Sequence, residues 1–65
     1  MNNIPLSKLA DFNDAFLRQL RVEVWDGDTI EDYGGPIERH SKYVVRINGM
    51  YYVKSQYQFY IRQEG

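Results

Sequence analysis

The sequence predicts a single α+β domain over residues 1–65, in which an N-terminal amphipathic helix packs on a three- or four-stranded antiparallel sheet. Three observations support this fold class: a helical period in residues 6–20, two alternating segments joined by Asn48-Gly49, and further period-two alternation at residues 20–25 and 56–62. The chain contains no internal repeat, low-complexity tract or linker, so we expect one domain throughout.

The helix is indicated by apolar residues that recur at helical spacing and fall within an arc of roughly 160°. These residues are Leu6, Leu9, Ala10, Phe12, Phe16, Leu17 and Leu20. Pro5 suits the first turn, where its missing N–H costs nothing, and Asn3 or Ser7 could cap the helix. No glycine or proline separates this helix from the strand expected at residues 20–25, so the boundary is open by a few residues.

The strongest local signal is Asn48-Gly49, whose preference for left-handed backbone suits a type I′ turn between residues 43–47 and 50–54. That turn predicts a register with four cross-strand pairs: Ile47 with Met50, Arg46 with Tyr51, Val45 with Tyr52, and Val44 with Val53. Residues 56–62 either extend the second strand of this hairpin or form a separate one.

Two breaks precede the hairpin. Asp26-Gly27 is a turn signal, and Gly34-Gly35-Pro36 is read as a second turn. The acidic segment of residues 28–33 is expected to be a loop or a short edge strand, because Pro36 is unsuited to a central strand.

Alternation gives the hairpin two faces that both carry apolar side chains. One face, our candidate protein interface, holds Tyr43, Val45, Ile47, Met50 and Tyr52; the other holds Val44, Val53, Tyr51 and Arg46 and continues in register to Tyr57, Phe59 and Ile61. A single helix covers one face only. Either a bulge near residues 55–56 switches the inward side, or apolar surface remains for a partner or a second copy.

Composition argues against most enzymatic and metal sites. Without cysteine there is no disulfide, Cys-based zinc site or thiol nucleophile, and one histidine builds no His-rich metal site. His40 and Ser41 do not indicate a Ser-His-acid arrangement, because neighbouring side chains on an extended chain point to opposite sides. We therefore expect His40 to be a surface residue at a strand edge. Gly34-Gly35-Pro36 lacks the lysine and hydroxyl of a phosphate-binding loop. The sequence therefore predicts no catalytic residue, no metal and no cofactor.

The acidic stretch of residues 26–32 carries four carboxylates in seven residues, at Asp26, Asp28, Glu31 and Asp32. Its glycine is misplaced for a calcium-binding EF-hand loop, so we interpret it as a solvated loop, with an acidic contact patch as the alternative. Trp25, which precedes it, is expected to anchor the core rather than contact a ligand.

Cations and aromatic rings interleave in the second half of the chain, at Arg46, Tyr51, Lys54, Tyr57, Tyr60 and Arg62. Single-stranded nucleic-acid binders use such a composition, with bases stacked on rings and phosphates held by cations. The charge distribution argues against it, because residues 1–33 carry a net charge of −4, residues 34–65 carry +3, and the pI is about 5.7.

These observations favour a small non-catalytic protein-binding module that is homodimeric and inhibits or regulates a larger protein. Single-stranded nucleic-acid binding is the alternative. The chain shows no signal-peptide pattern and no apolar run of about 18–20 residues, so we expect a cytoplasmic protein without a membrane segment. No motif in the sequence identifies a family.

Overall fold

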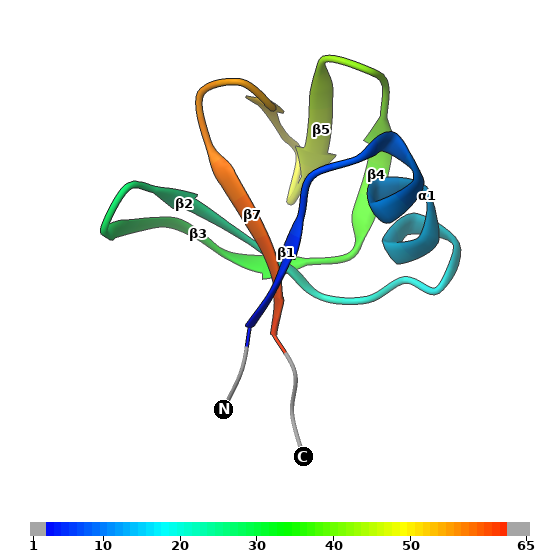
Figure 1. Ribbon diagram of the computed structural model, residues 1–65, viewed down its shortest axis with the longest axis horizontal. Helices are drawn as coiled ribbons and strands as arrows, with labels where there is room; N and C mark the ends of the chain where they lie inside the picture. Colours follow the sequence, from blue (N-terminus) through cyan, green and yellow to red (C-terminus); the bar gives the residue numbers. More distant parts are fainter. Residues whose placement is uncertain (1–2, 63–65) are drawn as a thin grey trace.

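The computed structural model describes residues 3–62 and confirms the α+β class (Figure 1). Within these residues the chain forms one helix and seven strands: β1 (Asn3–Leu6), α1 (Leu9–Leu17), β2 (Val22–Asp26), β3 (Thr29–Gly35), β4 (Ile37–His40), β5 (Val44–Ile47), β6 (Met50–Val53) and β7 (Gln58–Arg62). The N-terminal helix is shorter than predicted, because Leu6 belongs to β1 and the chain leaves the helix at Gln19, whose φ is +52°.

The start of the helix is fixed by a side chain that the sequence did not single out. Asp11 Oδ2 accepts hydrogen bonds from the backbone N–H groups of Ser7 (3.0 Å) and Lys8 (2.9 Å). These two bonds lower the pKa of Asp11, since they favour the ionised carboxylate. The predicted start of the helix was therefore wrong. Asn3, a proposed cap, and Pro5, expected in the first turn, lie in β1, where Pro5 is opposite Tyr60 on β7. The N-cap position is Lys8 rather than the other proposed cap, Ser7.

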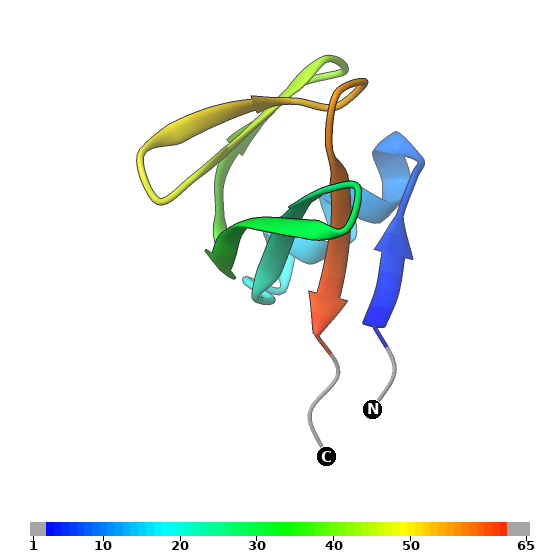
Figure 2. The ribbon, with the colours of Figure 1, turned by 90° about the vertical axis from the view of Figure 1, so that its left-hand side faces the viewer.

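The strands form two antiparallel sheets rather than the single sheet expected from the sequence. One has the order β1-β7-β2-β3 and the other β4-β5-β6, and in Figures 1 and 2 they fold around a shared interior with α1 beside β4. Gly34 and Gly35 carry the chain from the first sheet to the second. A Cβ on Gly34 (φ +104°) would lie 2.8 Å from the Val22 carbonyl oxygen, and one on Gly35 would lie 2.9 Å from Asn48 Oδ1.

The hairpin register is confirmed at all four cross-strand pairs, from Ile47–Met50 at the turn to Val44–Val53 at the open end. Asn48 and Gly49 have φ values of +52° and +78°, as a type I′ turn requires. Residues 58–62 form a separate strand, β7, which lies between β1 and β2 in the other sheet. The acidic segment forms the edge strand β3.

The core takes side chains from both sheets and from the helix. Its buried apolar residues are Leu6, Phe12, Ala15, Val22, Val24, Ile37, Val45, Ile47, Tyr52 and Phe59. The helix contributes less than its apolar arc predicts, because Leu9 and Leu17 are 53% and 70% exposed. The turn after β6 carries the chain from the three-stranded to the four-stranded sheet, so the hairpin and β7 can both point apolar residues inward. The bulge considered near residues 55–56 is therefore not needed.

Candidate functional site

The candidate interface splits into two groups in the structure. Val45, Ile47 and Tyr52 lie in the core and are at most 8% exposed, so they are not available to a partner in the folded chain. Tyr43 and Met50, at the two ends of the same face, are 68% and 58% exposed. The face predicted to meet a partner is thus the face that closes the core, and only its two ends remain at the surface.

The opposite face of the hairpin is the one left uncovered. Tyr51 and Val53 are 53% and 38% exposed, and the guanidinium carbon of Arg46 lies 5.5 Å from the centre of the Tyr51 ring. Arg39 on β4 is the cross-strand neighbour of Arg46. Arg46 Nε also lies 3.1 Å from a carboxylate oxygen of Glu38. This face combines exposed apolar side chains with two arginines.

The residues of the predicted nucleic-acid face do not form one surface. Arg46 and Tyr51 lie together on the three-stranded sheet, but Tyr60 and Arg62 lie on β7 in the other sheet. The Lys54 ammonium is 4.0 Å from the centre of the Phe12 ring and donates to the Ser41 carbonyl. Its pKa is lowered by desolvation. The remaining member, Tyr57, packs edge-on against Tyr52, with ring centres 5.4 Å apart.

Four strands have a free edge within residues 3–62, and three of them carry features that discourage further pairing. β1 contains Pro5. β3 has two register shifts against β2 and the acidic residues Glu31 and Asp32. β4 has one register shift and lies beside the helix, and Gln19, just after the helix, donates from Nε2 to the Ile37 carbonyl (3.2 Å).

β6 is the exception among these four edges. Its residues Met50-Tyr51-Tyr52-Val53 include no proline and no charge, and its pairing with β5 has no register shift. In a two-residue hairpin the pair next to the turn is hydrogen-bonded, so the backbone groups of Tyr51 and Val53 point away from β5. The Lys54 N–H bond to the Tyr43 carbonyl (2.8 Å) agrees with this alternation. The Val53 carbonyl accepts from Gln56 (3.0 Å), which leaves three outward backbone groups on β6.

One residue of the acidic segment has a structural role that the prediction of a solvated loop missed. Asp32 accepts hydrogen bonds from the Tyr52 hydroxyl (2.9 Å), the Asn48 side-chain amide (2.9 Å) and the Gly34 backbone N–H (2.8 Å). It therefore joins β3 to the hairpin across the two sheets. Burial, followed by the hydrogen bond and charge of Asp32, raises the pKa of Tyr52 to about 12. The spacing of Asp32 and Gly34, which is typical of an Asx turn, could have indicated from the sequence that Asp32 has a structural role.

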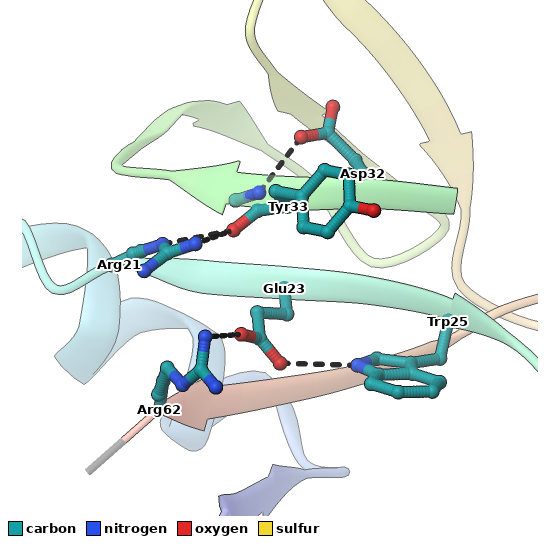
Figure 3. A network of polar contacts seen from close by, with 7 residues as sticks. Arg21, Glu23, Trp25, Asp32, Tyr33 and Arg62 are labelled. Atoms are coloured by element: carbon teal, nitrogen blue, oxygen red, sulfur yellow. Dashed lines mark hydrogen bonds and ion pairs between the residues drawn. The ribbon is translucent and has the colours of Figure 1, made fainter. Parts of the chain in front are cut away.

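A buried carboxylate lies on the outer side of the four-stranded sheet. Glu23 is 2% exposed and has two partners, shown in Figure 3: the Trp25 indole N–H donates to Oε1 (3.1 Å), and Arg62 Nη1 lies 3.3 Å from Oε2. Trp25 is half-buried beside this carboxylate and packs edge-to-face with Tyr60, with ring centres 6.4 Å apart. Because alternation places both residues on the sheet's outer face, Trp25 is not a member of the core.

His40, which was expected at the surface of a strand edge, is half-buried at the end of the edge strand β4. Its ring packs edge-on against Phe16, with centres 5.5 Å apart, and its Nδ1 has no hydrogen-bond partner among the residues that the structure describes. Desolvation, followed by the charge of Lys54, lowers the pKa of His40. Over residues 3–62 no group of three or more His, Cys, Asp or Glu side chains could hold a metal ion.

Comparisons with known proteins add no assignment. No protein-family model, curated protein or solved structure matches this chain. No helix in the described part of the chain is long and apolar enough to cross a membrane.

Proposed function

We propose that this domain is a non-catalytic protein-binding module that associates through the open edge of β6, forms a homodimer, and inhibits or regulates a larger protein. The observation that carries the proposal is the contrast among the four free edges: β6 alone, within residues 3–62, lacks a proline, a charge, a register shift and an adjacent helix. Unpaired edges of this kind accept a strand from another chain.

The side chains of β6 support the same use. Met50, Tyr51 and Val53 are each more than a third exposed, so an added strand would cover apolar area as well as pair backbone groups. In an antiparallel pairing of β6 with its copy, both partners present the same uncharged residues, so no like charges meet within the strand pair. A cytoplasmic location remains part of the proposal and rests on the sequence alone.

The test is light scattering on the protein and on the variant Tyr51→Pro. Proline at this position removes an N–H that points away from β5, so the hairpin keeps its own hydrogen bonds. We expect a concentration-dependent dimer for the original chain and a monomer for the variant. Tyr33→Thr is the matched control, because Tyr33 is 70% exposed but lies on β3. A strict monomer for the original chain, with no protein recovered in pull-downs, would contradict the proposal.

A second candidate, single-stranded nucleic-acid binding, is favoured by one local observation. Arg39 and Arg46 are cross-strand neighbours, and Arg46 lies over the Tyr51 ring. This cluster is much smaller than the predicted face. It predicts affinity for short single strands that falls as salt rises and is lost in Arg46→Gln. Absence of binding at low salt would remove this candidate.

A further inference from the structure

A small cavity on the four-stranded sheet is lined by two aromatic side chains and a carboxylate. It measures about 300 Å³ and is lined by Asn3, Trp25, Gly27, Asp28 and Tyr60. The Trp25 and Tyr60 rings stand perpendicular to each other, at an interplanar angle of 90°. Two aromatic walls and a carboxylate therefore border one open space.

Hydrogen bonds hold the residues that line this cavity in place. The Trp25 indole N–H donates to the buried Glu23 carboxylate, which is also paired with Arg62 (Figure 3). The turn at the cavity's rim is tied to β7, because the Gly27 N–H donates to the Gln58 side-chain carbonyl (2.8 Å). The ring and the rim are thus fixed before any ligand arrives, which reduces the ordering cost of binding.

The charge at the cavity favours a cation. Among the residues that line it, Asp28 is the charged one, and there is no lysine or arginine. Arg62, which lies beside Glu23, is not among the lining residues of the cavity, and its charge is balanced by that carboxylate. Asp28 at the rim is exposed and lines the cavity directly.

We propose that this cavity binds a methylated ammonium group, with Trp25 and Tyr60 as its aromatic walls and Asp28 as the counter-charge. Aromatic faces attract such cations through the ring quadrupole, and tryptophan is the strongest of these rings. Methylated ammonium suits the site better than a primary ammonium, because it gives up its hydration more easily against apolar ring faces. The group could belong to a small molecule or to a methylated lysine of a protein. The site lies on the other sheet from β6 and goes beyond the proposed function.

The test uses the fluorescence of Trp25, which is the only tryptophan in the chain. The protein is titrated with tetramethylammonium chloride, with a short peptide carrying trimethyl-lysine, and with neopentyl alcohol as the uncharged ligand of similar shape, all at constant ionic strength. We expect a saturable change with at least one of the two cations and none with the alcohol. Saturation by the free cation identifies a small-molecule site, and saturation by the peptide alone identifies a protein-borne ligand.

Variants separate the proposed contacts from a general effect on folding. We expect Tyr60→Leu to weaken binding about tenfold, while Tyr60→Phe keeps the ring and the affinity. Asp28→Asn, at an exposed turn position that leaves the fold intact, is expected to weaken binding about threefold. Tyr33→Leu is the matched control, because Tyr33 is 70% exposed and does not line the cavity, and it should bind as the original chain does. Equal binding of the alcohol, no saturation by either cation, or unchanged affinity in both Asp28→Asn and Tyr60→Leu would overturn the proposal.

Discussion

Two hairpins of this domain, β5–β6 and β2–β3, are closed by two-residue turns but are built differently. Asn48 and Gly49 both have positive φ, whereas in the β2–β3 turn Gly27 alone does, at +60°. The β5–β6 pairing is regular and uncharged along β6, while β2–β3 has two register shifts and an acidic strand. The β5–β6 hairpin therefore has an edge to which another strand can be added. In the β2–β3 hairpin, the register shifts and acidic side chains discourage such pairing.

What joins these two hairpins is a set of hydrogen bonds from the β5–β6 hairpin to β3. The Asn48 side chain donates to Asp32 (2.9 Å) and to the Gly34 carbonyl (3.3 Å), and the Tyr52 hydroxyl donates to Asp32 (2.9 Å). The regular hairpin therefore folds by local rules, but its position depends on hydrogen bonds to residues of the irregular strand β3.

The largest effect is expected at Gly34. Gly34→Ala should reduce the free energy of unfolding by about 3 kcal/mol, because the new Cβ would meet the Val22 carbonyl oxygen at a backbone angle of +104°. Gly27→Ala is the matched control: its φ is also positive, but nothing lies within 4 Å of the new Cβ, so it should cost about 1 kcal/mol. Urea unfolding of both variants measures the difference, and equal losses would show that close packing at Gly34 is not decisive.

The next effect concerns the link between the hairpins. Asp32→Ala removes three hydrogen bonds at once and should cost about 2 kcal/mol, whereas Asp28→Ala, at an exposed turn, should stay within about 0.5 kcal/mol. Thermal unfolding monitored by circular dichroism distinguishes the two. A similarly small loss of unfolding free energy in both variants would show that Asp32 contributes no more to stability than a solvated loop residue.

Alkaline pH provides an independent measure of the same link. The pKa of Tyr52 is raised to about 12, so the folded state favours the neutral phenol over the phenolate. The neutral phenol therefore stabilises the folded state fully below about pH 10, and this stabilisation is lost as the pH rises through 12. Tyrosine absorbance during alkaline titration should show one group that ionises late. In Asp32→Ala that group should ionise at lower pH; no change would indicate that burial alone raises its pKa.

The smallest effect is expected at His40. The pKa of His40 in the folded state is lowered below 6.5, so the folded state favours the neutral ring. The stability that the neutral ring contributes is fully present above pH 6.5 and is lost as the pH falls through the pKa of His40 in the folded state. NMR titration of the imidazole should place the midpoint below 6.5, and Lys54→Met should move it upward by removing the nearby charge. A midpoint at 6.5 or above in the original chain would contradict the packing of His40 against Phe16.

The sequence predicted what depends on neighbouring residues and missed what depends on distant ones. The Asn48-Gly49 turn and its register follow from local backbone preference, so they were predictable. The division into two sheets depends on a close approach at Gly34 and Gly35, which the glycines and Pro36 indicate only as a break. The helix was predicted too long because Leu6, which has helical spacing, is held in β1 opposite Phe59.

The candidate interface shows the same limit. Alternation correctly divided the hairpin into two faces, but it could not say which face meets the core. The answer depends on Val45 and Ile47 meeting residues of the helix and the other sheet, and the exposed face is the one with Tyr51 and Val53. The roles of Asp32 and Glu23 were missed for a related reason, since each has partners on another strand.

We propose that the outer edge of β6 pairs with another strand, and amide hydrogen exchange tests this pairing most directly. The Tyr52 N–H, which points toward β5, should be protected at every protein concentration. The Tyr51 N–H points away from β5 and should exchange rapidly in dilute protein but become protected as concentration rises and copies associate. Rapid exchange of the Tyr51 N–H at all concentrations, in a sample that light scattering shows to be dimeric, would contradict the account.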